Sequence, residues 1–274
     1  MRQPVLFECE GNQLVGTLDG AEGETGQEIG LLIVSGGNEI RSGAYAGQAA
    51  MAATFAAQGY PVFRYDRRGV GDSEGENAGF ESSRQDIAAA IAAFQAAVPK
   101  VRRIVAFGNC DAASALLLFH TGLAIDALVL ANPWVIETNI QEDAPPTLSA
   151  TAIRARYLAR IKNPRSLLDL LMGKIDLKKL MRGLIAASKT QTSGNLSTQV
   201  AGALTSCNIP VRLLIAKRDA TALEFMAVWL GSDCIAARSK ANITLNIIDT
   251  ASHSFADAAA KDWLIDQISE CLEW

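Results

Sequence analysis

Cys110 stands at the centre of the sequence GNCDA, residues 108–112, in a setting that favours chemistry. A nucleophile carried on a sharp strand-to-helix turn needs small residues two positions before it and two positions after it, and Gly108 and Ala112 meet that demand. The start of a helix also stabilises a thiolate. The motif therefore predicts a cysteine nucleophile, with the backbone N–H of Asp111 placed to bind an oxyanion.

The same motif has two other interpretations. Cys110 could be a small buried core residue, because cysteine often serves only to fill space. Alternatively, Asp111 could be the nucleophile, as in hydrolases that use a carboxylate. That register would place Asn109 where a small residue is required, which counts against it.

His253 and Asp219 are the predicted partners of Cys110. His253 follows a predicted strand after three residues, and Asp219 follows another after two. Both therefore fall at strand carboxyl ends, on the edge of the sheet at which Cys110 also lies. The chain order nucleophile, acid, histidine matches one known order of catalytic triads. His253 is predicted to act as the base, and Asp219 as the acid that orients it.

Other residues compete for these roles. Asp249 ends a predicted strand and could replace Asp219. Asp257 begins a predicted helix, where an acidic residue stabilises the helix dipole. The second histidine of the chain, His120, closes an apolar helix and is expected to contact the end of that helix.

The loop after the apolar run 29–35 is expected to supply the second oxyanion donor. It reads Gly36-Gly37-Asn38, and small residues let the backbone approach a substrate closely. Gly37 and Asn38 are both candidates. The charged turn at residues 64–73, R-x-D-x-R-G-x-G-x-S, is expected to brace the loops around the site and to have no catalytic role.

Apolar runs and helical segments alternate along most of the chain and would position these residues. The predicted strands span residues 5–8, 13–18, 29–35, 60–65, 101–108, 127–131, 210–216 and 244–249. The predicted helices span residues 42–58, 82–98, 112–120, 221–238 and 257–272. This alternation predicts an α/β fold, with a mostly parallel central sheet and helices on both faces.

Residues 133–206 break the alternation, because they contain helical patterns and no convincing strand. Leu177, Leu180 and Leu184, for example, recur on one face of a helix. The interval is therefore predicted to be a helical cap, residues 133–206, inserted into a core made of residues 1–132 and 207–274.

Composition narrows the class of protein. The 274 residues carry a net charge of −4, which gives no indication of nucleic-acid binding. The five cysteines form no disulfide pattern, the first residues lack the long apolar stretch expected of a signal peptide, and no run approaches the ~20 apolar residues of a membrane span. We therefore expect a reduced, cytoplasmic protein. With two histidines, neither a metal site nor another cofactor is expected.

Several motifs resemble known proteins. DRRGVGDSEG at 66–75, GNCDAAS at 108–114, KRD at 217–219 and ASHSF at 251–255 together resemble the α/β-hydrolase superfamily. NPWV at 132–135, ARYL at 155–158 and GKIDLKKLMRGL at 173–184 resemble the exosortase A system-associated hydrolases, a subgroup with a Cys-Asp pair at the same turn. The resemblance implies the α/β-hydrolase fold and a bacterial cytoplasmic protein linked to exopolysaccharide production and protein sorting. The loop at 36–41 departs from the superfamily, because it lacks the usual His-Gly start.

Three functions are consistent with these residues. The first is hydrolysis of an ester, thioester or lactone through an acyl-cysteine. The second is acyl transfer to a hydroxyl acceptor such as a glycan, which a water-excluding cap would favour. The third is a non-catalytic binding protein on a hydrolase fold.

The predicted cap is strongly basic. Between Thr151 and Gly183 it carries nine Lys or Arg against two Asp, a local charge of +7. Charged helix faces are usually just solvated, but a second hypothesis is that the cap faces an anionic substrate or partner. The expected partner is therefore a small-molecule acyl substrate, which is anionic under the second hypothesis, and no nucleic-acid partner is expected.

Overall fold

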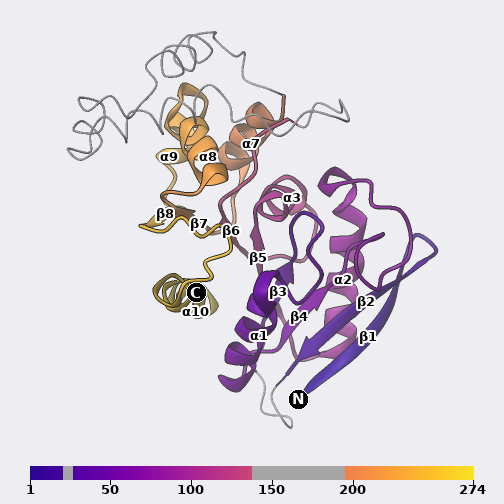
Figure 1. Ribbon diagram of the computed structural model, residues 1–274. Helices are drawn as coiled ribbons and strands as arrows, with labels where there is room; N and C mark the ends of the chain where they lie inside the picture. The colour runs from indigo at the N-terminus through magenta and orange to yellow at the C-terminus, as the bar shows by residue number, and fades with distance from the viewer. Residues whose placement is uncertain (21–26, 138–194) are drawn as a thin grey trace, which may run out of the picture.

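The protein is built around one twisted sheet of eight strands (Figure 1). The structure is a computed structural model and describes residues 1–20, 27–137 and 195–274. The spatial order of the strands is β1-β2-β4-β3-β5-β6-β7-β8. The strands β1 and β2 pair antiparallel, β2 pairs antiparallel with β4, and all further pairs are parallel. The mostly parallel α/β sheet predicted from the sequence is thus confirmed.

The elements that build the sheet and its covering layers have the following bounds. The strands are β1 (Arg2–Cys9), β2 (Asn12–Asp19), β3 (Ile29–Val34), β4 (Val62–Tyr65), β5 (Arg103–Asn109), β6 (Ala127–Ala131), β7 (Val211–Ala216) and β8 (Ile243–Ile248). The α-helices are α1 (Gly47–Ala57), α2 (Arg84–Ala97), α3 (Asp111–Phe119), α7 (Asn195–Ser206), α8 (Ala220–Leu230), α9 (Ile235–Arg238) and α10 (Ala258–Leu272). Short 3-10 helices lie at Ala44–Ala46, Phe80–Ser82 and Ser232–Cys234.

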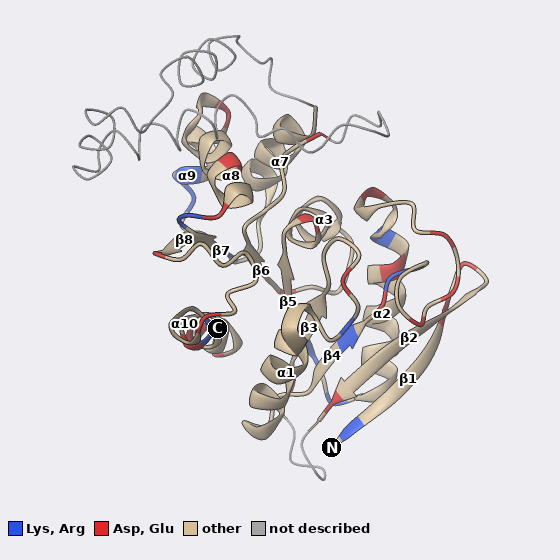
Figure 2. Cartoon of the chain, viewed as in Figure 1, with Lys and Arg blue, Asp and Glu red and all other residues tan. Residues whose placement is uncertain are grey.

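Helices cover both faces of the sheet, and each face has its own apolar cluster. One cluster joins the sheet to α2, α3, α7 and α8 through side chains such as Phe94, Leu116 and Phe225. The other joins it to α1 and α10 through Phe55 and Ile268. The central strands β3, β6 and β7 are buried almost throughout, as expected of parallel strands between two helical layers. Helix α1 carries no charged residue along its whole length (Figure 2).

Two predicted helices differ from the observed ones. The helix predicted at 42–58 begins only at Gly47, because Tyr45 and Ala46 have left-handed backbones with φ of 53° and 55°. The helix predicted at 221–238 is divided at Gly231, whose φ and ψ of −69° and 174° are extended. Both interruptions are backbone conformations that side-chain periodicity does not report.

Most of the predicted cap lies outside the described residues, including its basic side chains at 154–182 and the helical face at 177–184. The flanks of that segment are described and lie together, because the Glu137 carboxylate accepts a hydrogen bond of 3.2 Å from the N–H of Leu196. An insertion requires flanks that meet in this way. The division into a core of residues 1–132 and 207–274 and a cap of residues 133–206 stays a prediction.

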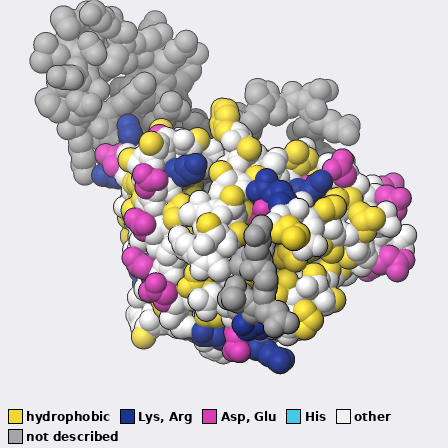
Figure 3. All heavy atoms as spheres, turned by 90° about the horizontal axis from the view of Figure 1, so that it is seen from below, with side chains coloured by type: hydrophobic (Ala, Val, Ile, Leu, Met, Phe, Trp, Pro, Cys, Tyr) yellow, Lys and Arg dark blue, Asp and Glu magenta, His cyan; other side chains and the backbone are white. Residues whose placement is uncertain are grey.

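Charge distribution and helix length bear on the partners that the protein could have. On the face shown in Figure 3, basic and acidic side chains of the described residues both occur, and hydrophobic side chains gather between them. Within the described ranges no single helix is long and apolar enough to cross a membrane, although the bent pair Ala220–Leu230 and Ser232–Arg238 has a suitable combined length and composition.

Candidate active site

Cys110 occupies a strained turn between β5 and α3. Its φ and ψ are 63° and −127°, in the half of backbone space that residues with a side chain rarely adopt. Gly108 lies so close to α3 that a Cβ atom on it would come within 2.9 Å of backbone atoms of Ala112 and Ala113. The N–H of Cys110 donates to the carbonyl of Ala131 in β6 at 3.0 Å. The small residues in the motif thus allow the strand to turn directly into the helix.

His253 contacts Asp219 and interacts with Cys110, the two residues predicted to be its partners. Its Nδ1 lies 3.0 Å from Oδ2 of Asp219. Hydrogen bonds to Asp219 and then to Cys110 raise the pKa of His253 to about 10, against the opposing effect of burial. Because Nδ1 faces Asp219, Nε2 is the nitrogen left for the thiol of Cys110. At neutral pH this arrangement favours the imidazolium, which is the partner that a thiolate requires.

Asp219 is held in place by the helix that it begins. Its carboxylate caps α8, because Oδ2 accepts a hydrogen bond of 3.0 Å from the N–H of Ala222. The residue is only 8% exposed. One carboxylate therefore both starts a helix and fixes the histidine ring.

The two competing carboxylates lie elsewhere. Asp249 is exposed and forms an ion pair of 2.8 Å with Arg218. Asp257 caps α10 through the N–H of Ala260 and accepts a hydrogen bond of 2.6 Å from Thr250, which lowers the pKa of Asp257. Of the three candidate acids, Asp219 is the one that contacts His253.

His120 lies at the end of α3, as the sequence predicts. Its Nδ1 is 2.8 Å from the carbonyl of Leu117 in the last turn, and its Nε2 is 3.5 Å from Sγ of Cys207. The expected contact with the helix end is confirmed. In the parts of the chain that the structure describes, no three His, Cys, Asp or Glu side chains come together as a metal site.

The two candidate oxyanion loops meet through Asp111. The N–H of Gly37 donates to Oδ1 of Asp111 at 2.6 Å, so this donor is occupied by a carboxylate of the protein itself. Arg67 donates to the carbonyl of Gly37 and lies 3.9 Å from Oδ2 of Asp111. The N–H of Asp111 belongs to the first turn of α3, where N–H groups have no partner within the helix. The Asn38 side chain accepts a hydrogen bond of 2.7 Å from Asn77.

The charged turn at 64–73 holds the loop at residues 36–41 in place. Asp66 is fully buried and accepts hydrogen bonds from the N–H of Arg41 at 2.5 Å and of Asp72 at 3.0 Å. Arg64 pairs at 2.8 Å with Asp19 in β2, and both side chains are 3% exposed. These contacts agree with the bracing role predicted from the sequence.

Asn132 is a site residue that the sequence reasoning did not single out. It is fully buried, with φ of 42°, immediately after β6. Its Nδ2 donates at 3.1 Å to the carbonyl of His253 and at 3.2 Å to Oδ1 of Asn109, while its Oδ1 accepts from the N–H of Ala216. The Nδ2 of Asn109 also donates to the carbonyl of His253. An asparagine directly before a proline at a strand end was the available signal.

Comparison with known proteins places the chain in a family. A family model described as serine aminopeptidase, S33 (Hydrolase_4) matches residues 27–256. The chain belongs to this family of α/β hydrolases. At the turn after β5 this chain carries a cysteine, Cys110.

Solved structures share the fold of this S33 hydrolase at low sequence identity. The esterase Pf2001 from Pyrococcus furiosus has a TM-score of 0.64 and 16% identity, with 100% of this chain and 92% of that chain covered. The thioesterase domain from the curacin biosynthetic pathway has a TM-score of 0.59 and 15% identity, with 98% and 99% covered. An alpha/beta hydrolase from Sphaerobacter thermophilus has a TM-score of 0.55 and 20% identity, with 97% and 100% covered. No curated protein sequence matches the chain.

Proposed function

We propose that this S33-family chain hydrolyses esters or thioesters through a covalent acyl-cysteine on Cys110. The observation that carries the proposal is one chain of contacts at the carboxyl edge of the sheet. Cys110 sits on the strained turn, an interaction with Cys110 contributes to the raised pKa of His253, and Asp219 holds the far side of the imidazole ring at 3.0 Å. A nucleophile, a proton carrier and an orienting acid are thereby in register.

The first half-reaction forms the acyl-enzyme. The thiolate of Cys110 attacks the carbonyl carbon of the substrate, forming a carbon–sulfur bond while the carbonyl oxygen becomes an oxyanion. The N–H of Asp111 and a second N–H, from Gly37 or Asn38, stabilise that charge. The imidazolium of His253 then gives its proton to the departing alkoxide or thiolate as the bond to the leaving group breaks.

The second half-reaction releases the product. Neutral His253 takes a proton from water, whose oxygen attacks the acyl carbon, and the carbon–sulfur bond breaks to give a carboxylic acid and the Cys110 thiolate. If Gly37 is the second donor, the Asp111 carboxylate must first leave its N–H. Arg67, already 3.9 Å away, is positioned to receive that carboxylate.

The Cys110→Ser variant tests the identity of the nucleophile. A hydroxyl must lose its proton to the imidazole, but the contact with Asp219 keeps the pKa of His253 high, so little neutral base is present at pH 7. Hydrolysis of an acetyl thioester should therefore fall by about 10²- to 10⁴-fold, the usual contribution of a working general base. Wild-type rates in Cys110→Ser would rule out the thiol as nucleophile.

The biological setting is proposed from sequence alone. The resemblance to exosortase A system-associated hydrolases supports a role beside bacterial exopolysaccharide production, in the cytoplasm, where five unpaired cysteines would remain reduced. Two of the three motifs that carry this resemblance lie outside the described residues. Deletion of the gene, with secreted exopolysaccharide measured, tests the link, and an unchanged polymer output would oppose it.

A further inference from the structure

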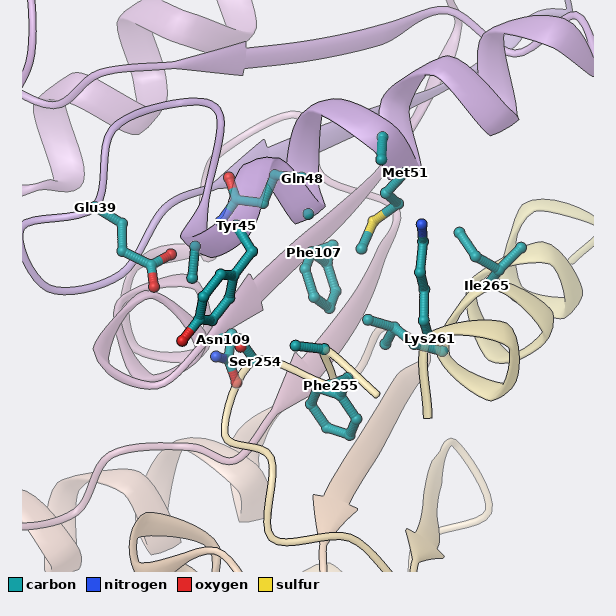
Figure 4. A pocket seen from close by; sticks show the side chains of 15 residues that line it. Glu39, Tyr45, Gln48, Met51, Phe107, Asn109, Ser254, Phe255, Lys261 and Ile265 are labelled. Atoms are coloured by element: carbon teal, nitrogen blue, oxygen red, sulfur yellow. The ribbon is translucent and has the colours of Figure 1, made fainter. Parts of the chain in front are cut away.

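A cavity of about 130 Å³ opens beside the catalytic edge (Figure 4). It lies between α1, α10 and the loop that follows His253. Asn109 and Ser254 line it, and these residues are the immediate chain neighbours of Cys110 and His253. A group that enters the cavity is therefore next to the proposed nucleophile and base.

The walls of the cavity are mainly apolar. Met51 comes from α1, Phe107 from β5, Phe255 from the loop after His253, and Leu264 and Ile265 from α10. An apolar cavity of about 150 Å³ is known to hold benzene, so this one matches a group of about six carbon atoms. Its size and lining suit a short acyl chain.

Ala44 and Tyr45, from the strained segment Gly43–Ala46, form another wall. Gly43, Tyr45 and Ala46 have φ of 70°, 53° and 55°, and left-handed backbone at residues with side chains is kept mainly where a site requires it. Tyr45 is 90% exposed, and in Figure 4 its ring stands at the mouth of the cavity. An interaction with the backbone of Ala44 acts to lower the pKa of Glu39, which places this carboxyl close to the segment.

Two charged side chains lie on opposite sides of the cavity. Figure 4 shows Glu39 beside Tyr45 and Lys261 on the far side, next to Ile265. Burial raises the pKa of Glu39, and the nearby His253 opposes that effect. Lys261 makes no ion pair within the described ranges, and it stands in the first turn of α10, where the helix dipole disfavours a cation. The charge of Lys261 therefore does not stabilise α10.

We propose that this cavity binds the acyl chain of the substrate, with up to about six carbons, and that a carboxylate at the far end of the chain pairs with Lys261. The inference rests on the proposed acyl-cysteine function and names its substrate class, the monothioesters or monoesters of short dicarboxylic acids. Glu39, near His253, repels an anionic end and so orients the chain with its carbonyl toward Cys110 and its carboxylate toward Lys261.

Gly47 allows the size of the cavity to be changed cleanly. It lines the cavity, and a Cβ atom on it would meet no atom within 4 Å. In the wild type, kcat/KM for N-acetylcysteamine thioesters should rise about fourfold per methylene from acetyl to hexanoyl. In Gly47→Leu the hexanoyl-to-acetyl ratio should fall by at least about tenfold, because the new side chain displaces several methylenes. Gly202→Leu, on the opposite helical layer in α7 and equally uncrowded, should keep the wild-type ratio.

Lys261→Met tests whether Lys261 pairs with the carboxylate at the far end of the substrate's acyl chain. Glutaryl and pentanoyl thioesters have the same number of carbons and differ in the distal carboxylate, so the ratio of their kcat/KM values isolates that group. The ratio should fall about fivefold in Lys261→Met, the value of one solvent-facing ion pair, and the loss should shrink in high salt. Lys100→Met removes the same charge at the opposite end of β5 and should leave the ratio unchanged.

The outcomes separate the inference from the proposed function. The cavity is not the acyl site, and the proposed function stands, if an acetyl thioester acylates Cys110 but two ratios of kcat/KM stay at their wild-type values. These are the hexanoyl-to-acetyl ratio in Gly47→Leu and the glutaryl-to-pentanoyl ratio in Lys261→Met. If only the Lys261→Met ratio is unchanged, the dicarboxylic substrate class is wrong. If no thioester acylates Cys110, the proposed function fails and the inference fails with it.

Discussion

Gly108→Ala is the substitution that most directly probes the packing of the turn at Cys110. The added methyl group would lie 2.8 Å from C and 2.9 Å from O of Ala112, and 2.9 Å from N of Ala113. Gly108 has no positive φ, so the whole effect comes from this contact and none from backbone strain. The glycine is paired with Val34 in β3 and Leu130 in β6, so the strand cannot move away. The first turn of α3 must yield instead, and Cys110 moves with it.

The magnitude follows from comparable overpacking. Forcing one methyl group into a tightly packed site costs about 1–3 kcal/mol of unfolding free energy. A displacement of the nucleophile by about 1 Å can cost about 10²-fold in turnover. Both effects should appear together in Gly108→Ala.

Gly202→Ala is the matched control. Gly202 lies inside α7, and a Cβ atom there would meet nothing within 4 Å. The same chemical change should stabilise the protein by about 0.5–1 kcal/mol, because alanine is the better helix former. Denaturant unfolding followed by circular dichroism, with kcat/KM for an acetyl thioester, measures both variants. A Gly108→Ala protein with wild-type stability and turnover would refute the reasoning about the turn.

Three further predictions follow from the site. Asp219→Asn should retain the cap on α8, because asparagine caps a helix as well as aspartate does. It should nevertheless lower kcat by about 10²- to 10⁴-fold, because the imidazolium loses its charged partner. A variant whose loss of kcat is explained by a matching loss of folded protein would contradict this. Iodoacetamide at neutral pH should label Cys110 first, because burial raises the pKa of the other four thiols. The pKa of Cys9 rises to about 11 and that of Cys271 to about 12. Equal labelling rates of all five cysteines in peptide mapping would count against a reactive Cys110. Folding raises the pKa of His253 from 6.5 to about 10, so its contribution to stability is complete below pH 6.5 and is lost as the pH rises to about 10. The denaturation midpoint of the wild type should fall over that pH window, and that of His253→Gln should fall less. Parallel pH profiles for the two proteins would oppose the pairing of His253 with Asp219 and Cys110.

The elements that carry the site could be predicted because their signals are local. The apolar run before Gly108 and the small residues after Cys110 specify a strand that turns into a helix, and the structure has both. His253 and Asp219 could be placed because each follows a buried strand closely, and parallel strands end at one edge of a sheet. Their contact at 3.0 Å depends on that shared edge.

The remaining features depend on tertiary contacts that have no local signature. The hydrogen bond from Gly37 to Asp111 joins residues 74 positions apart, and either side of it reads as an ordinary loop or helix start in the sequence. Residues 42–46 are predicted as the start of a helix, but Tyr45 and Ala46 adopt left-handed backbone, which the identity of these residues does not signal. Asn132 acts through Asn109, Ala216 and His253, three separate chain segments.

The most direct test of the central claim is intact-protein mass spectrometry after rapid mixing with an acetyl thioester, beside Cys110→Ala. We predict a transient increase by the mass of one acetyl group that maps to Cys110, disappears as product accumulates and is absent in the variant. Product release without any adduct at Cys110, or the same adduct on the Cys110→Ala protein, would contradict covalent catalysis by this cysteine.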